Sequence, residues 1–367
     1  MKRRDFLKQA GAGAAAGAGI TAAPFVHAAP PRLHWRMAAS WPVSLDTIYG
    51  GAQDIARRVS ELTGGRFQIR TYAGGEIVGG LQVFDAVSQG TVQMGHTASY
   101  YYIGKAPSLA FDTTLPFGFN ARQQYAWQMK AGGNELLNKE VFADFNILTL
   151  PGGNTGCQMG GWFRKPVPNL KSLNGIKMRI PGFGGKIMAR MGVNVQTLAG
   201  AEIYPALERG VIDATEWVGP YDDMKLGFYQ VAKYYYAPSW WEPNAQLSLY
   251  INRKAWNSLP KEYQHAISVA AAESNQSMLA EYDARNPKAL RDLLAKGVHL
   301  ETFSNDIMQA ASNHATDIYQ ELSSKDKTWR KVYAHWNKFR QTEFAWFNAN
   351  EMRYADFAMG HAPLKDL

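Results

Sequence analysis

The sequence has few of the residues that build covalent or metal-centred sites. Cys157 is the only cysteine in 367 residues, so disulfide frameworks and cysteine-based metal or haem motifs are excluded. The histidines show no metal-protease spacing. Neither a GxGxxG turn into a helix nor a GxxxxGKS/T loop occurs, so a phosphate-binding loop is not indicated.

Charge of one sign and long apolar runs are also scarce. The 39 basic and 31 acidic residues give a formal net charge of +8, and no block of Lys or Arg occurs. Nucleic-acid binding therefore has little support, whereas a mild positive balance is compatible with an anionic small solute. The run 10–25 is too short and too rich in glycine for a membrane span, which needs roughly 20 strongly apolar residues.

The first 28 residues have the pattern of an export signal. Arg3 and Arg4 precede Phe-Leu-Lys, as in a twin-arginine leader, and the small-residue pattern at 26–28 indicates cleavage before Ala29. Removal of residues 1–28 takes away four positive charges and one negative charge, which leaves +5. The sequence thus predicts a periplasmic protein, long enough for two domains or one large one.

Strand and helix patterns alternate after the leader, which predicts an α/β fold with parallel strands. In the first part, alternating apolar residues predict strands, and helical spacing predicts helices between them. The ranges are 33–38, 66–72 and 91–97 for strands, and 50–62 and 81–89 for helices. Further on, strands are predicted over 176–180 and 211–214, with a helix over 186–191.

A weak internal repeat points to two similar lobes. Residues 84–97 align with residues 204–217, and both segments read as helix, glycine, strand and exposed tip. Because this order is common in α/β proteins, coincidence is an open alternative. If the repeat is real, both strand tips face a shared cleft, and the first tip carries three consecutive tyrosines at 100–102.

Two charged residues are candidates for ligand contact because each follows a predicted strand. Ligands of open α/β folds lie beyond the carboxyl ends of the strands. Glu216, followed by Trp217, is placed there, although a solvated Glu beside a core Trp is an alternative. Arg179 precedes a glycine loop and a helix, which suits bidentate carboxylate recognition, although a surface arginine is an alternative.

The last hundred residues are predicted to be mainly helical. A helix over 261–285 is expected to break at Asn286-Pro287, because proline lacks a backbone donor, and to resume as far as Gly297. A strand is expected over 298–303. The segment 325–360 is a helix with many aromatic rings. These rings either pack on the two lobes or cover a subunit interface.

Several motifs together resemble one family, the solute receptors of TRAP (tripartite ATP-independent periplasmic) transporters. Within it, the receptors for α-keto acids are the most similar. The resemblance extends from the leader to the last helix and rests on the leader and on residues 44–46, 151–156, 158–163, 177–179, 203–208, 213–223 and 240–242.

The resemblance implies a two-domain periplasmic binding protein fold with hinge-crossing strands, a closing cleft and a long helix across both lobes. The implied first lobe covers 29–150 and is completed by about 246–303, and the second lobe covers 151–245. The C-terminal helices, 304–367, are implied to be exchanged between two subunits of a homodimer.

The family also implies a small organic carboxylate bound together with a cation. Arg179 is similar to the residue that holds the substrate carboxylate. Four groups of this chain are similar to the family's cation ligands, some of which also contact the substrate. All four offer oxygen donors: Gln158, Glu216, the backbone carbonyl of Trp217 and Glu242. Such donors suit sodium or calcium and not zinc or copper.

On the first lobe, Tyr100 or Tyr101 is similar to the substrate contact, and the neighbouring Tyr102 leaves the choice open. The side chains of Trp240 and Trp241 are expected to wall the cleft. The expected function is a receptor that delivers a 2-oxo acid such as pyruvate, or a 2-hydroxy acid, to the TRAP membrane subunits.

Two other functions are open at this point. An exported enzyme could use paired carboxylates, either Asp222 with Asp223 or Asp213 with Glu216, but the sequence shows no nucleophile–base pattern and no cofactor motif. A receptor that signals to a membrane kinase would have the same fold and the same site. The choice of carboxylate and of sodium or calcium is equally open.

Overall fold

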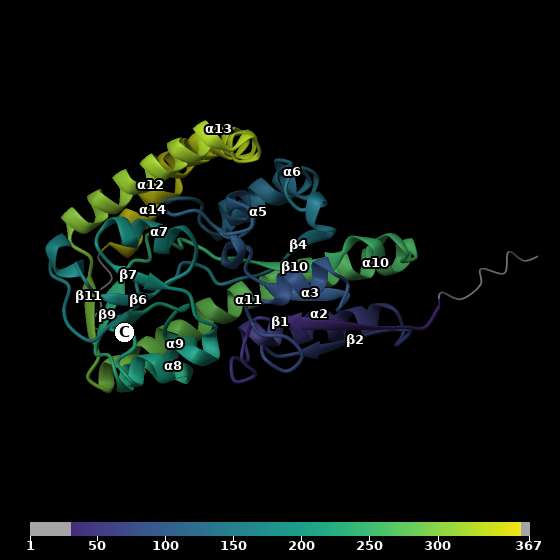
Figure 1. Ribbon diagram of the computed structural model, residues 1–367, viewed down its shortest axis with the longest axis horizontal. Helices are drawn as coiled ribbons and strands as arrows, with labels where there is room; N and C mark the ends of the chain where they lie inside the picture. The colour runs from purple at the N-terminus through teal and green to yellow at the C-terminus, as the bar shows by residue number, and fades with distance from the viewer. Residues whose placement is uncertain (1–30, 361–367) are drawn as a thin grey trace, which may run out of the picture. The chain divides into compact units, whose positions relative to one another are not determined.

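A computed structural model of the chain describes residues 31–360 (Figure 1). The predicted leader, residues 1–28, lies outside the described residues. Among the residues that are described, no helix combines the length and apolar character needed to cross a bilayer.

The first sheet has five strands in the order β2-β1-β3-β10-β4. The three strands predicted in the first part of the sequence run parallel to one another, whereas β10 is antiparallel to both of its neighbours. The strands are Leu33–Ala39 (β1), Phe67–Tyr72 (β2), Met94–Thr97 (β3), Ile147–Asn154 (β4) and Gln246–Asn252 (β10).

The second sheet has six strands in the order β11-β9-β5-β8-β6-β7. They are Trp162–Phe163 (β5), Lys177–Arg179 (β6), Asn194–Gln196 (β7), Ala214–Thr215 (β8), Tyr234–Ala237 (β9) and His299–Thr302 (β11). The stretch 246–303, expected to complete the first lobe, therefore divides. Its first strand, β10, joins the first sheet, while β11 pairs with β9 in the second sheet.

The chain passes between the two sheets through paired segments, 155–161 after β4 and 238–245 before β10. The backbone N–H of Thr155 donates to the Ala245 carbonyl at 3.1 Å, and that of Gln158 donates to the Glu242 carbonyl at 3.2 Å. These bonds tie the two crossing segments to each other. They also bring Gln158 and Glu242, which lie far apart in the sequence, side by side.

Helix α11 (Lys261–Ala295) connects the two halves of the molecule. It packs on β4 and α2 (Ile48–Leu62) beside the first sheet and on α9 (Pro220–Leu226) beside the second (Figure 1). The break predicted at Asn286-Pro287 is wrong, because Pro287 lies inside the helix. Packing on α9 offsets the lost backbone bond: the Asn286 side chain accepts from the backbone N–H of Tyr221 at 3.1 Å.

The two segments of the internal repeat have the same order of elements. Helix α3 (Val83–Ser88) precedes β3, and α8 (Gly200–Glu208) precedes β8. Between helix and strand, Gly90 and Gly210 both adopt left-handed backbone conformations, with φ of +78° and +71°, which end a helix at no steric cost. Each strand then runs parallel to one of its neighbours, β3 to β1 and β8 to β6.

The C-terminal helices are α12 (Asn305–Lys325), α13 (Lys327–Ala349) and α14 (Glu351–Met359). The first half of α13 is buried: Trp329 lies 4.6 Å from Phe111 and 5.2 Å from Phe183, measured between ring centres. Phe111 belongs to the short helix α4 (Ala110–Thr113), which comes before β4 in the chain, and Phe183 belongs to α7 (Gly182–Arg190) beside the second sheet. Beyond residue 345, Trp346, Tyr354 and Phe357 are exposed and Phe347 is buried, so packing on the two lobes accounts for only part of the aromatic tail.

The remaining helices flank the sheets, and one apolar core joins them. The short helices are α4 (Ala110–Thr113), α5 (Ala121–Lys130), α6 (Gly133–Glu140) and α10 (Arg253–Asn257). The larger buried cluster contains residues from both sheets, including Trp41 beside the first and Trp217 beside the second. A second buried cluster fills the space between the first sheet, α2 and α11.

Candidate functional site

The two charged residues singled out at strand ends contact each other. β6 and β8 are parallel neighbours, so Arg179 at the end of β6 lies beside Thr215, and Glu216 follows directly. The Arg179 Nη1 contacts Glu216 Oε1 and donates to the Glu216 carbonyl at 3.2 Å, while Nε donates to the Leu198 carbonyl at 3.1 Å. Both side chains are 1% exposed, so the alternatives of a surface arginine and a solvated glutamate are wrong.

Burial and charge act in opposite directions on this pair. Burial raises the pKa of Glu216 to about 7, although the Arg179 charge opposes the shift. Burial also works against the charge of Arg179, but Glu216 and the Tyr101 hydroxyl keep its pKa above the ordinary value. A guanidinium does not give up its proton in proteins, so the direct contact favours an ionised pair.

The crossing segments place two more oxygen-bearing side chains beside the pair. Glu242 is 3% exposed and Gln158 is 4% exposed. Burial raises the pKa of Glu242 well above its ordinary value, and the nearby Glu216 carboxylate adds to the shift. Two buried carboxylates this close repel each other, and a cation between them removes the repulsion.

Four buried polar atoms in this cluster have no hydrogen-bond partner among the described residues. They are Arg179 Nη2, Glu216 Oε2, Glu242 Oε2 and Gln158 Oε1. Buried groups are rarely left unpaired, since each costs free energy. One guanidinium donor and three oxygen acceptors match a carboxylate bound next to a hard cation. The predicted fourth cation ligand, the Trp217 carbonyl, follows Glu216 in the chain.

A small cavity lies between the two sheets beside this cluster. It measures about 10 Å³, roughly the space that one water molecule requires. Its walls come from both sheets and from the crossing segments: Trp41, Ile48, Tyr100, Tyr101, Thr155, Gln158, Trp217, Val218, Ala245 and Leu247. A ligand with several heavy atoms therefore needs rearranged side chains or a wider cleft.

The three tyrosines of the first tip have different positions. Tyr100 and Tyr101 line the cavity and also border a second cavity of about 340 Å³. Tyr102 does not line either one, because its hydroxyl pairs with Thr97 Oγ1 at 2.9 Å and its ring packs on Phe84. The structure thus leaves Tyr100 and Tyr101 as the first-lobe candidates.

The cavity walls differ in part from those that the sequence predicts. Trp240 and Trp241 do not line the cavity: Trp240 stacks on Phe117 at 5.5 Å, and Trp241 packs on Phe303 at 5.8 Å. Sequence reasoning missed Trp41, although it lies only two residues beyond the end of β1. The rule that ligands lie beyond parallel strand ends, which found Glu216, could have found Trp41 too.

A polar cluster outside the cavity, also missed, connects the two halves of the molecule. Asp46, beyond the first sheet, contacts Lys225 and accepts from the Tyr221 hydroxyl at 3.0 Å, both on α9. Arg285 of α11 donates to the same hydroxyl at 2.9 Å and to Thr47 Oγ1 at 3.1 Å. We call residues Asp46, Tyr221, Lys225 and Arg285 the interlobe clasp.

The carboxylates that an enzyme could use do not form a pair. Asp223 accepts from Trp162 Nε1 at 2.9 Å and from the Tyr235 hydroxyl at 2.7 Å, whereas Asp222 accepts from the Tyr282 hydroxyl at 2.8 Å. Neighbouring in sequence, they point to different elements and anchor them. Burial raises the pKa of Asp222 to about 7 and that of Asp223 to about 6.

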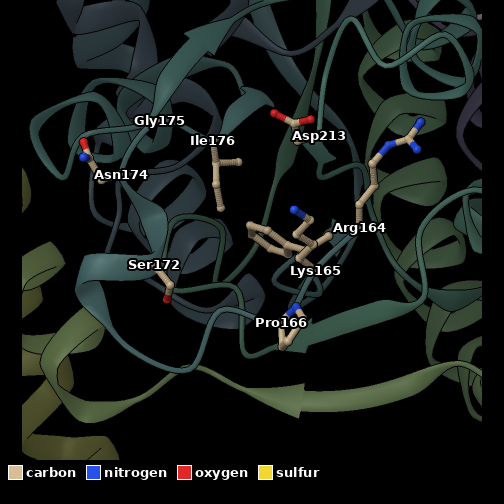
Figure 2. Close-up of a pocket in the computed structure, with 9 residues that line it drawn as sticks. Arg164, Lys165, Pro166, Ser172, Asn174, Gly175, Ile176 and Asp213 are labelled. Atoms are coloured by element: carbon tan, nitrogen blue, oxygen red, sulfur yellow. The ribbon is translucent and has the colours of Figure 1, made fainter.

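Asp213 lines a cavity to which Glu216 does not contribute. Figure 2 shows this cavity, which measures about 400 Å³ and includes Asp213 together with Arg164 and Lys165 in its wall. The Asp213 carboxylate accepts from the backbone N–H of Lys177 at 3.0 Å. None of the residues predicted to bind the substrate or the cation lines this cavity.

The described residues contain no group of three or more His, Cys, Asp or Glu side chains able to hold a metal ion. The predicted cation site is of another kind, since it combines two carboxylates with an amide oxygen and a backbone carbonyl. Such mixed oxygen donors are common for calcium.

Comparison with known proteins gives a consistent result. Residues 37–326 match the family described as bacterial extracellular solute-binding protein, family 7 (DctP). The monocarboxylate 2-oxoacid-binding periplasmic protein of Nostoc sp. is 52% identical over 362 residues, which cover 98% of this chain and 99% of that protein.

Two solved structures show the same fold at high similarity. A TRAP transporter solute-binding protein from Bordetella bronchiseptica RB50, a mixed-occupancy dimer with calcium and picolinate, has 46% identity and a TM-score of 0.88; the match covers 90% of this chain and 98% of that one. A TRAP periplasmic solute-binding protein from Pseudoalteromonas atlantica T6c, with sodium and pyruvate, has 37% identity and a TM-score of 0.85, covering 89% and 99%. The chain therefore belongs to the DctP family of TRAP solute-binding proteins, as its motifs indicate.

Proposed function

We propose that this protein is a periplasmic TRAP receptor that binds a small 2-oxo acid such as pyruvate together with a calcium or sodium ion. The observation that carries the proposal is the cluster of unpaired buried atoms on Arg179, Glu216, Glu242 and Gln158. Its family consists of solute-binding receptors and not of enzymes. The similar proteins named above bind a 2-oxoacid, pyruvate with sodium, or picolinate with calcium.

The residues have separate tasks in this proposal. Arg179 gives its unpaired Nη2 to the substrate carboxylate. Glu216, Glu242, Gln158 and the Trp217 carbonyl surround the cation, and the 2-oxo group with one carboxylate oxygen completes its coordination. A ligand of this size has little apolar surface, so charge-assisted bonds and coordination supply its affinity. The same donors suit a 2-hydroxy acid.

Binding of the acid and of the cation should be cooperative, because each neutralises charge that the other leaves buried. Titration calorimetry with pyruvate, in buffer free of calcium and sodium and then with each ion alone, tests this. We expect binding in at least one ion and a loss of affinity of about tenfold or more without either. Equal affinity in all buffers would contradict the shared-cation site.

The lobes and their closure follow the family pattern in our proposal. The first lobe comprises 29–150, completed by β10 and α11, and the second comprises 151–245 together with β11. The paired crossing segments serve as the hinge, and closure excludes water from the cation, which strengthens each charge contact. The closed receptor then delivers its ligand to the TRAP membrane subunits.

We also propose that the C-terminal helices, 304–367, form a homodimer in which these helices are exchanged. The support is apolar surface on α13 and α14: Trp346 is 56% exposed and Tyr354 is 67% exposed. One similar protein is a dimer. Light scattering tests the proposal with Trp346→Asp and Tyr354→Asp together, which should yield monomers, while Lys338→Asp on the same helix serves as a charge control.

Export through the twin-arginine route completes the proposal. The leader residues Arg3 and Arg4 carry it. Replacement of both by Lys should retain the unprocessed chain in the cytoplasm, as cell fractionation and mass measurement would show, whereas processed protein in the periplasm would contradict this route.

A further inference from the structure

Part of the cavity wall is apolar, and the proposed function assigns no role to the residues that form it. Trp41 and Ile48 from the first half of the chain, Leu247 and Ala245 from β10 and its crossing segment, and Val218 form this part of the wall. Gln158 of the charged cluster lines the same cavity, so a 2-oxo acid held by that cluster would have its side chain next to these apolar residues. The shape of this part of the wall therefore limits which side chain fits.

Trp41 is the largest of these residues, and its position is fixed by contacts on several sides. Its side chain is 1% exposed. Its ring meets that of Trp217 at 6.2 Å and 78°, and that of Tyr101 at 6.2 Å. Its indole Nε1 donates to His96 Nδ1 at 2.8 Å. A fully buried donor with a partner is costly to displace.

His96 in turn is held by the first sheet. Since Nδ1 accepts from Trp41, the ring proton lies on Nε2, which donates to the Gly152 carbonyl of β4 at 3.1 Å. Both ring nitrogens are thus used, and one neutral tautomer is selected. Burial lowers the pKa of His96 to about 4, which keeps the ring neutral at physiological pH.

We propose that Trp41, positioned by His96, is the specificity-determining wall of the ligand cavity and restricts the receptor to 2-oxo acids with short side chains. The inference rests on the proposed function and adds the substrate range. A rigid ring rejects an extra methylene more strongly than a flexible wall does, because close-packed surroundings resist expansion. His96 acts through Trp41 and is a positioning residue.

The test compares affinities for pyruvate, 2-oxobutyrate and 2-oxoisovalerate by calorimetry at saturating calcium. The wild type should bind pyruvate best. Trp41→Phe removes ring width and the indole donor, and should shift the ratio of affinities toward the two longer acids by about tenfold, the discrimination typical of one methylene. The ratio, unlike the absolute affinity, does not report general damage to the fold.

Two substitutions at His96 separate positioning from packing. His96→Asn places an amide oxygen near the position of Nδ1 and should keep the wild-type ratio. His96→Leu leaves the indole donor of Trp41 unpaired and should shift the ratio in the direction of Trp41→Phe. The indole N–H resonance of Trp41, identified by its loss in Trp41→Phe, should move in His96→Leu and stay close to its place in His96→Asn.

The outcomes distinguish the inference from the function beneath it. If the wild type binds none of the acids, the proposed function fails and the inference fails with it. If the wild type binds pyruvate and Trp41→Phe leaves the ratio within about twofold, only the wall is overturned. A shifted ratio in Trp41→Phe with an unchanged ratio and an unmoved resonance in His96→Leu overturns the role of His96 alone.

Discussion

His96 and Glu216 occupy equivalent places in the two halves of the internal repeat, yet their surroundings are opposite. His96 is neutral, and both of its ring nitrogens have partners. Glu216 is paired with Arg179, and each of the two has a buried polar atom left unpaired. At the first tip, the ring nitrogens of His96 have their hydrogen-bond partners among the described residues. At the second tip, Arg179 and Glu216 keep buried polar atoms that a ligand of matching charge could pair with.

This difference indicates a division of labour between two similar strand tips. The neutral tip fixes an aromatic wall, and such a satisfied contact favours one conformation. In our proposal the charged tip binds the ligand, because buried charges gain free energy when a ligand and a cation satisfy them. The same order of helix, glycine and strand thus supports a rigid aromatic wall in one half and a charged candidate binding site in the other.

The largest expected effect comes from removing the charge of the second tip. Arg179→Met should weaken pyruvate binding by about a thousandfold, since loss of one partner in a buried charged contact costs several kcal/mol. Calorimetry at saturating cation measures this. Because Glu216 is then buried without a counter-charge, the unliganded protein should also melt at a lower temperature.

A double variant separates the two consequences. Arg179→Met with Glu216→Gln removes both charges, so the melting temperature of the unliganded protein should recover toward that of the wild type, while binding stays lost. Recovery of binding in the double variant would contradict the role of Arg179 as the carboxylate contact.

Acid should remove the contribution of His96, at the first tip, to the stability of the fold. The pKa of His96 in the fold is about 4, below the ordinary 6.5, so the unfolded chain takes up the proton first. The stability that neutral His96 provides is complete above pH 6.5 and is lost as the pH falls toward 4, by up to about 3 kcal/mol.

Denaturant unfolding of the wild type and His96→Asn across this pH range measures that loss. The Asn variant keeps an acceptor for Trp41 but cannot be protonated there, so the difference in unfolding free energy between the two proteins should change with pH. A constant difference from pH 7 to pH 4 would mean that His96 does not titrate as its surroundings indicate.

A smaller effect should follow from weakening the cation set at the second tip. Glu242→Gln keeps the size of the side chain and removes one buried carboxylate, so it should raise the calcium concentration needed for pyruvate binding by about tenfold to a hundredfold. The affinity at saturating calcium should change less. Asp283→Asn, which changes an exposed carboxylate of α11 outside the cavity wall, serves as the control.

The interlobe clasp should contribute least. Asp46 is about half exposed and contacts Lys225 and Tyr221 in solvent, and such contacts are worth at most about 1 kcal/mol. Asp46→Asn should accelerate pyruvate release by at most about fivefold, and salt should reduce the difference. Stopped-flow displacement measures the rate, and a tenfold or larger change would give the clasp a greater part in closure.

The proximity of the two charged candidates was predictable because it depends on strand order and local pattern. Alternating strands and helices place the ends of parallel neighbouring strands at one edge of the sheet. This rule singled out both Arg179 and Glu216, although they lie 37 positions apart in the sequence. Gln158 and Glu242 were assigned to the cation only through the family resemblance, since their proximity depends on pairing between two irregular crossing segments.

Other features depend on contacts that no local pattern contains. Pro287 interrupts a helical pattern, yet packing on α9 carries the helix through it. Trp240 and Trp241 look like cleft walls in the sequence, but the space around Phe117 and Phe303 holds them elsewhere. Side-chain direction in such runs follows from neighbours distant in the chain.

The sequence by itself determined the α/β class, the two similar segments and the charged residues at the end of the second sheet, because periodicity, glycine stops and strand ends are local properties. Only the tertiary structure decided that β11 joins the second sheet, that Trp41 and not Trp240 lines the cavity, and that His96 holds Trp41. These outcomes depend on which buried donors and rings meet across the fold, and that is settled by packing and hydrogen bonding between residues far apart in the sequence.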